Sequence, residues 1–93
     1  MVDQPPRIKA ITEQYPEASF LQADGFDGAI LGVVYGSEPP RLAYSVAIIL
    51  ATLMEEGMTY EDAREHFDFN IGGGYVGDQT PVWVEDEEML LYR

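Results

Sequence analysis

The sequence predicts an α+β fold: a small antiparallel or mixed sheet of three or four strands, with a buried helix packed on one face and a second, acidic helix outside it. Residues 29–35 are nearly all apolar and rich in β-branched side chains, which is typical of a strand in a sheet interior. Residues 46–56 carry apolar side chains at helical spacing. A chain of 93 residues has room for one hydrophobic core, so we expect a single domain spanning 1–93.

The first predicted element is a short amphipathic helix at residues 4–15. Ile8, Ile11 and Tyr15 stand at i, i+3 and i+7 and form one apolar stripe. Prolines suit the first turn, where a missing amide costs nothing, and Pro16 ends the helix.

Three strands are then expected before the main helix. Residues 19–23 are the first, followed by the two Asp-Gly steps of "DGFDG", which favour a turn. Residues 29–35 are predicted to be the central strand, buried on both faces. After the turn residues "GSEPP", residues 41–45 are a candidate third strand.

The main helix is predicted at residues 46–56, with Ser45 as its N-cap and Gly57 as its left-handed C-terminal residue. A second helix is predicted at 60–69, where Thr59 is the N-cap and Asp62 stands three residues on, as in a capping box. Its outward positions are mostly acidic. The last strand is expected at residues 81–85, and the sequence does not place the tail "MLLYR".

The segment "IGGGYVGD" contains Gly72, Gly74 and Gly77 in the G-x-G-x-x-G spacing of dinucleotide-binding loops. Such a loop requires a strand before the glycines and a helix after them, so that the helix N-terminus faces the pyrophosphate. The order expected here is the reverse, a helix before and a strand after. We therefore interpret the glycines as a helix end and a sharp turn, with Tyr75 and Val76 entering the core, and we expect no nucleotide cofactor.

Charge is the extreme feature of the composition. Seventeen Asp and Glu residues face five Lys and Arg residues, a net charge of −12. Because Lys and Arg contacts to phosphate dominate nucleic-acid affinity, direct binding to DNA or RNA is disfavoured, as is binding to anionic membranes. Three explanations of the acidity stay open: solubility, including in high salt, a negative face for a basic protein surface, or a polyvalent cation site.

The same composition limits other sites. There are no cysteines, so disulfides and thiolate metal sites are excluded. The longest apolar stretch, 46–54, is about half of a bilayer span, and the N-terminus lacks the pattern of a signal peptide, so we expect a cytoplasmic protein without a membrane-spanning segment.

Metal and catalytic sites are not expected. Asp62 and His66 lie one helical turn apart, but a zinc site needs more ligands of these kinds, and we interpret the two as a surface pair. "DGFDG" departs from the calcium-loop pattern. The serines have no nucleophile elbow around them, and the acids stand in runs or at surface spacing, so we expect no enzyme activity.

The aromatic residues allow two interpretations. In the first interpretation, the aromatic residues around the second helix and the last strand lie in the core. These residues are Tyr44, Phe67, Phe69, Tyr75 and Trp83. The alternative is that Tyr75, Trp83 or Tyr92 anchors a protein interface, where such side chains are enriched.

Several segments resemble a family of small, mostly uncharacterised acidic proteins encoded in phage and prophage genomes. The resemblance lies in "DGFDGAILGV", in "LMEEGMTYEDA" and in "FDFNIGGGYVGDQTP". Matching positions in the last segment are Phe69, Asn70, Gly74, Gly77, Thr80 and Pro81. The resemblance implies a phage setting, where small acidic viral proteins include inhibitors of host defence such as anti-CRISPR proteins, some of them nucleic-acid mimics. It transfers no catalytic residues.

These observations lead to a first hypothesis: a non-enzymatic, phage-type binding protein that inhibits a host nucleic-acid-handling or defence protein, such as a nuclease, through an acidic surface. The residues expected to bind the basic partner are Glu55, Glu56, Glu61, Asp62, Glu65, Asp68, Glu85, Asp86, Glu87 and Glu88. The alternative is a self-associating assembly module without inhibitory activity, a homodimer paired through an exposed strand edge or the "MLLYR" tail.

Overall fold

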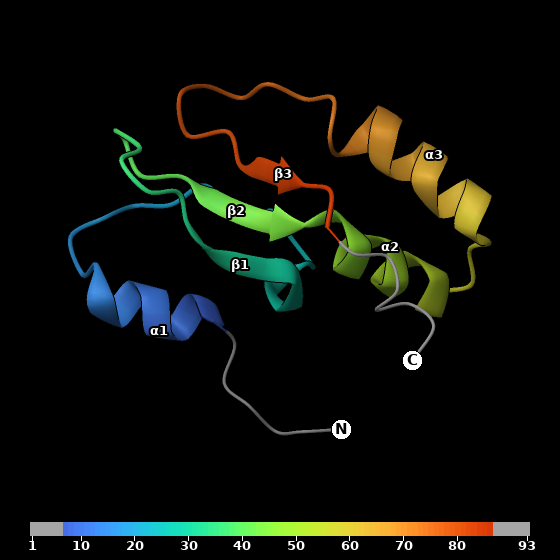
Figure 1. Cartoon of the computed structure of the whole chain (residues 1–93), viewed down its shortest axis with the longest axis horizontal. Helices are drawn as coiled ribbons and strands as arrows, with labels where there is room; N and C mark the ends of the chain where they lie inside the picture. The colour runs from blue at the N-terminus through green and yellow to red at the C-terminus, as the bar shows by residue number, and fades with distance from the viewer. Residues whose placement is uncertain (1–6, 87–93) are drawn as a thin grey trace.

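The computed structural model describes residues 7–86, and this range forms three α-helices and a three-stranded mixed sheet (Figure 1). The helices are α1 (Arg7–Gln14), α2 (Val46–Glu55) and α3 (Tyr60–Asn70), and the strands are β1 (Ile30–Val33), β2 (Leu42–Ser45) and β3 (Val82–Val84). A short 3-10 helix, η1 (Asp27–Ala29), leads into β1. The predicted α+β class is confirmed.

The predicted place of β1 in the sheet is wrong. The strand order is β1-β2-β3, so β2 is central and β1 lies at an edge. The pairing of β1 with β2 is antiparallel and irregular between Ile30 and Gly32, and Leu31 is 36% exposed. Helix α1 packs beside β1, and Arg7 Nη1 donates a hydrogen bond to the Leu31 carbonyl (3.2 Å). The apolar residues of β1 are therefore explained by a helix that packs beside an edge strand, and not by a strand on each side.

The strand predicted at residues 19–23 is also wrong, because this segment is irregular. It runs behind the sheet in the view of Figure 1. The amide N–H of Ala23 donates to the Tyr44 hydroxyl at 2.8 Å, and Phe20 and Phe26 pack against the core. A side-chain hydroxyl thus satisfies a backbone donor that the prediction assigned to a strand ladder.

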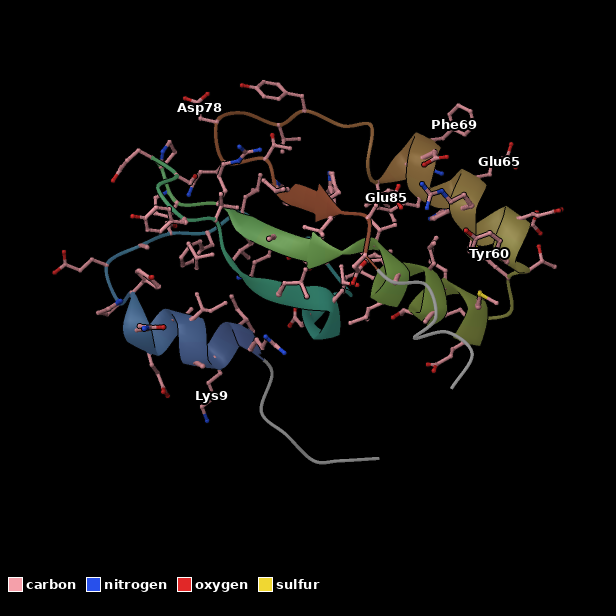
Figure 2. All side chains as sticks on the ribbon, viewed as in Figure 1. Lys9, Tyr60, Glu65, Phe69, Asp78 and Glu85 are labelled. Carbon is pink, nitrogen blue, oxygen red and sulfur yellow. The ribbon has the colours of Figure 1, made fainter. Side chains whose placement is uncertain are left out.

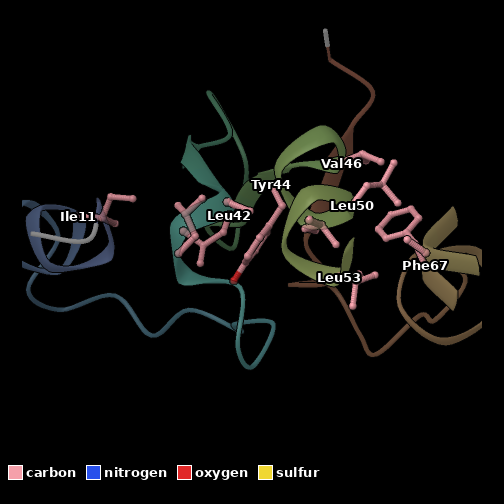
Figure 3. Close-up of a cluster of buried hydrophobic side chains, with 11 residues drawn as sticks. Ile11, Leu42, Tyr44, Val46, Leu50, Leu53 and Phe67 are labelled. Carbon is pink, nitrogen blue, oxygen red and sulfur yellow. The ribbon is translucent and has the colours of Figure 1, made fainter. Parts of the chain in front are cut away.

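The core lies on one face of the sheet. Ile30 pairs with Tyr44, and Tyr44 with Trp83, so these three side chains share a face. Figure 3 shows the cluster extending from Ile11 of α1 through Leu42 and Tyr44 of β2 to α2 and α3. Tyr44 is fully buried, and burial raises the pKa of its hydroxyl, which keeps that group neutral as a hydrogen-bond partner.

Helix α2 begins and ends as the sequence predicts. Ile48 N–H donates to Ser45 Oγ at 3.0 Å, which confirms the N-cap. At the other end Gly57 has a φ of 111°, and Met58 N–H reaches back to the Leu53 carbonyl at 3.3 Å, as in a Schellman motif. The tight turn places α3 directly after α2, and together the two helices form the crossover that makes β3 parallel to β2.

Helices α1 and α3 also match their predicted positions. Helix α1 ends at Gln14, one residue before the predicted end, and predicted residues 4–6 lie outside the described range. Helix α3 is capped at Thr59, whose Oγ1 accepts from the Asp62 amide at 3.1 Å. Across residues 7–86, no helix has the length and apolar character needed to cross a membrane.

Candidate protein-binding surface

Six of the ten predicted partner-binding residues lie exposed on α2, α3 and the turn between them. We call this set the acidic surface: it comprises Glu55, Glu56, Glu61, Asp62, Glu65 and Asp68. On α3, Glu61 and Glu65 are separated by four residues and Glu65 and Asp68 by three, so these carboxylates are neighbours on the helix exterior. Figure 2 shows Glu65 at the outer side of α3.

The acids of α3 lie on its outer side, because its other side is buried against the core. Ala63 is fully buried and Phe67 is 5% exposed, and both belong to the core cluster. Positions between them turn outward, as the 3.6-residue period requires. The prediction that the outward positions of this helix are mostly acidic is confirmed.

One cation lies among the acids of the surface. Arg64 Nε stands 3.9 Å from Asp68 Oδ1, one helical turn away. The same guanidinium donates from Nη1 to Glu85 Oε1 at 3.1 Å and from Nη2 to Glu85 Oε2. Glu61, Asp62 and Glu65 therefore form the part of α3 with the most negative charge.

Glu85, another predicted partner-binding residue, ties the end of β3 to α3 (Figure 2). The hydrogen bond from Arg64 lowers the pKa of the Glu85 carboxyl below its ordinary value, and the same contact raises the pKa of Arg64. The Glu85 side chain is 58% exposed, yet its charge is compensated. It contributes little net potential to the acidic surface.

Asp86, another predicted partner-binding residue, caps α2. Ser45 Oγ donates to Asp86 Oδ2 at 2.5 Å, and the Ala47 amide donates to Oδ1 at 3.1 Å. A carboxylate at a helix N-terminus accepts from otherwise unpaired amides and complements the helix dipole. The sequence offered no signal for this contact, because Asp86 and Ser45 are 41 residues apart. The remaining two predicted residues, Glu87 and Glu88, lie outside the described range.

A shallow depression of about 490 Å³ lies beside the acidic face of α3. It is lined by Met58, Asp62, Glu65, His66, Phe69 and Asn70. His66 Nδ1 lies 3.3 Å from Asn70 Nδ2, and no group of three or more metal-ligating side chains occurs within residues 7–86. The depression combines two carboxylates, Asp62 and Glu65, with the apolar surface of Met58 and Phe69.

Phe69 and Tyr75 are the aromatic residues that the core prediction misplaced. Phe69 is 78% exposed and Tyr75 is 76% exposed, and Val76 beside it is 66% exposed. Phe69 stands two residues after buried Phe67, which puts it on the outer side of α3. Trp83 is the aromatic residue of this region that packs on the core, with its ring centroid 5.6 Å from that of Phe67 and 5.4 Å from that of Tyr44.

The glycine segment joins α3 to β3, so the helix precedes the glycines and the strand follows them, as expected. A Cβ on Gly72 would lie 2.7 Å from the Phe67 ring, which explains a residue without a side chain there. The loop is anchored by Thr80, whose Oγ1 accepts from Val76 N–H (2.8 Å) and donates to the Gly77 carbonyl (2.7 Å). Gly72 therefore serves packing, and Gly77, with a φ of 115°, serves the turn.

Comparison with known proteins adds no relative. No protein-family model, no curated protein and no solved structure matches this chain.

Proposed function

We propose that this protein is a non-enzymatic binding protein that docks its acidic surface onto a basic protein surface. The observation that carries the proposal is the row of solvent-exposed carboxylates on α3, in which Glu61, Asp62 and Glu65 gather on the exterior of one helix. Clustered charge of one sign steers oppositely charged partners and sets the orientation of encounter.

Exposed apolar groups beside these carboxylates support protein recognition rather than simple solvation. Phe69 is 78% exposed and lines the same depression as Asp62 and Glu65. Aromatic side chains contribute much of the binding energy at protein interfaces, while surrounding charges fix specificity and association rate. A helix evolved for solubility alone gains nothing from an exposed phenyl ring.

The resemblance to phage-encoded proteins leads us to propose a host nucleic-acid-handling or defence protein as the partner. Such proteins hold basic channels for nucleic-acid phosphates. A helix with carboxylates on successive turns offers negative charges to these channels. Binding would then block access of the nucleic acid, which makes the protein an inhibitor.

Charge reversal on α3 tests the proposal. We expect Glu61→Lys and Glu65→Lys, alone and together, to reduce capture of host proteins from lysate, and wild-type capture to fall steeply between about 50 and 200 mM salt. Glu13→Lys with Glu17→Lys is the matched control, since it changes net charge equally at exposed positions near α1. Capture that is unaffected by the α3 variants, or equally reduced by both pairs, would contradict a specific acidic surface.

A second candidate function, self-association through the sheet, rests on the position of β3. This strand forms an edge of the sheet, and Ala43 and Val82, paired on the face opposite Tyr44, are only partly buried. Light scattering tests it: a dimer that dissociates with Val82→Lys supports the sheet as interface, and a monomer at all concentrations rules it out.

A further inference from the structure

A second recess, separate from the acidic face of α3, lies where three distant segments of the chain meet. It is an apolar groove of about 320 Å³, between the segment before η1, the loop after α3, and β3. Its apolar walls come from Leu21, Ala23, Phe26, Ile71, Val76 and Trp83. This volume is at the lower end of the range for ligand pockets, about 300–1,000 Å³, and suits one or two side chains of a partner.

The walls of the groove are held in place from behind. Trp83 packs on Tyr44 and meets the edge of Phe67, and Ala23 is tied by its amide to the Tyr44 hydroxyl at 2.8 Å. On the opposite side the Thr80 hydroxyl fixes Val76 N–H at 2.8 Å. Binding therefore needs little ordering of the protein, which lowers the entropic cost of association.

The mouth of the groove exposes apolar surface that an occupant would cover. Val76 is 66% exposed and Leu21 is 38% exposed, and both belong to the lining. Tyr75, 76% exposed, stands next to Val76 in the loop. A buried anchor ringed by residues that exclude water is the usual arrangement of an interface hot spot.

Charge decides what kind of segment fits. The charged residue of the lining is Asp24, and no Lys or Arg is among the lining residues. Arg41 lies next to the lining, because its Nε donates to the carbonyl of the lining residue Thr80 at 2.8 Å, and it keeps its positive charge there. A cation next to an apolar side chain can pair with Asp24 of the lining and is attracted by the net charge of −12, whereas a carboxylate in its place is repelled by both.

We propose that this groove is a docking site for a short peptide segment that carries one large apolar side chain next to Lys or Arg. Asn70 lines both this groove and the depression beside α3, so the two recesses meet at that residue. The inference rests on the proposed function in one respect: the segment is taken to belong to the same basic partner.

The single tryptophan of the chain provides the readout, because Trp83 lines the groove. The probe is the peptide acetyl-Lys-Leu-Lys-amide, titrated into the full chain while Trp83 fluorescence is recorded. We expect a saturable change in emission. Acetyl-Lys-Ala-Lys-amide, which lacks the anchor, and acetyl-Glu-Leu-Glu-amide, which reverses the charge, should each bind at least about ten-fold more weakly.

Gly74 is one of the residues that line the groove, and Gly74→Leu adds a bulky apolar side chain at that position. A Cβ at Gly74 has its nearest neighbour, the Ile71 carbonyl oxygen, at 4.0 Å, so a side chain is accommodated there. We expect this variant to keep its thermal unfolding midpoint and to lose the peptide-induced change. Gly28→Leu is the matched control, because a Cβ there meets nothing within 4 Å, and it should bind as the wild type does.

The outcomes separate this inference from the proposed function. Absence of a saturable change, equal binding of the three peptides, or undiminished binding by Gly74→Leu overturns the groove. Loss of partner capture in Glu65→Lys together with intact peptide binding supports two separate contacts. Intact capture in Glu65→Lys with loss in Gly74→Leu leaves the groove standing and contradicts the acidic surface.

Discussion

At the scale of single residues, Gly72 shows how packing determines a sequence feature that resembles a ligand motif. Its amide donates to the Phe67 carbonyl at 2.7 Å at the end of α3, so the chain folds back over the Phe67 ring. The space a Cβ would occupy is taken by that ring. Gly74, by contrast, has open space around it.

This difference predicts unequal effects of the same substitution. Gly72→Ala places a methyl group 2.7 Å from Phe67 Cε2 and must displace a buried ring, at a cost of about 1–3 kcal/mol in the free energy of unfolding. Gly74→Ala meets no close atom and should change that free energy by less than about 0.5 kcal/mol. Urea unfolding of both variants measures the difference. Equal losses would show that backbone freedom, not the Phe67 contact, requires glycine in this loop.

The difference between charged residues that we propose to bind a partner and those that hold the fold is also a matter of single residues. The sequence predicts the same role, binding a partner, for both Glu65 and Asp86. In the structure Glu65 faces solvent, whereas Asp86 accepts from Ser45 and Ala47 at the N-terminus of α2. Only the contacts distinguish them.

At the scale of elements, α3 is held to the sheet by two kinds of contact. Phe67 packs against Trp83 of β3, and Arg64 pairs with Glu85 just beyond that strand. The first contact is apolar and independent of pH. The second contact depends on the charge of Glu85, and therefore on pH.

The ion pair predicts a pH dependence with a defined sign. Because the folded state lowers the pKa of Glu85 from its ordinary value of 4.5, its contribution to stability is present above that pH and is lost as the pH falls through the lowered folded value. Glu85→Gln should remove this part of the acid-induced loss and cost less than about 1 kcal/mol at pH 7, since the pair is partly exposed.

Urea unfolding between pH 7 and 3 provides the measurement. Glu17→Gln, which removes an exposed carboxylate near α1 and outside the ion pair, is the control. A Glu85→Gln variant whose stability falls with acid as steeply as that of the wild type would show that the pair contributes nothing to the docking of α3.

At the scale of the whole molecule, the net charge of −12 is unevenly distributed. Among residues 55–68 there are six acids and one arginine, whereas Arg7 and Lys9 both lie on α1. Figure 1 places α1 and α3 at opposite sides of the sheet. Acids also occur elsewhere, so the surface is a concentration of negative charge rather than its sole location.

Placement of charge, beyond its total, should therefore affect stability. Glu65 neighbours Glu61, Asp62 and Asp68 on α3, so Glu65→Lys converts three repulsive pairs into attractive ones and should stabilise the fold by about 0.5–1 kcal/mol at low salt. Glu17→Lys changes net charge equally without those neighbours and should stabilise less. Thermal unfolding at low and high NaCl compares them, with the difference shrinking as salt screens the pairs. Equal stabilisation would indicate that only total charge matters.

The prediction that Glu65→Lys stabilises the protein while weakening partner capture also distinguishes function from folding. A variant that loses binding because it unfolds cannot be more stable than the wild type.

The sequence by itself determined the α+β class, both caps of α2, the cap of α3 and the acidic exterior of that helix. All of these depend on residues within about one or two helical turns of each other, and short-range spacing and hydrogen bonding suffice to specify them. Only the tertiary structure decided that β2 is central, that Asp86 caps α2 and that Tyr75 stays exposed. Those outcomes depend on which distant segments compete for the same buried donor, edge or space, and local pattern carries no information about such competitors.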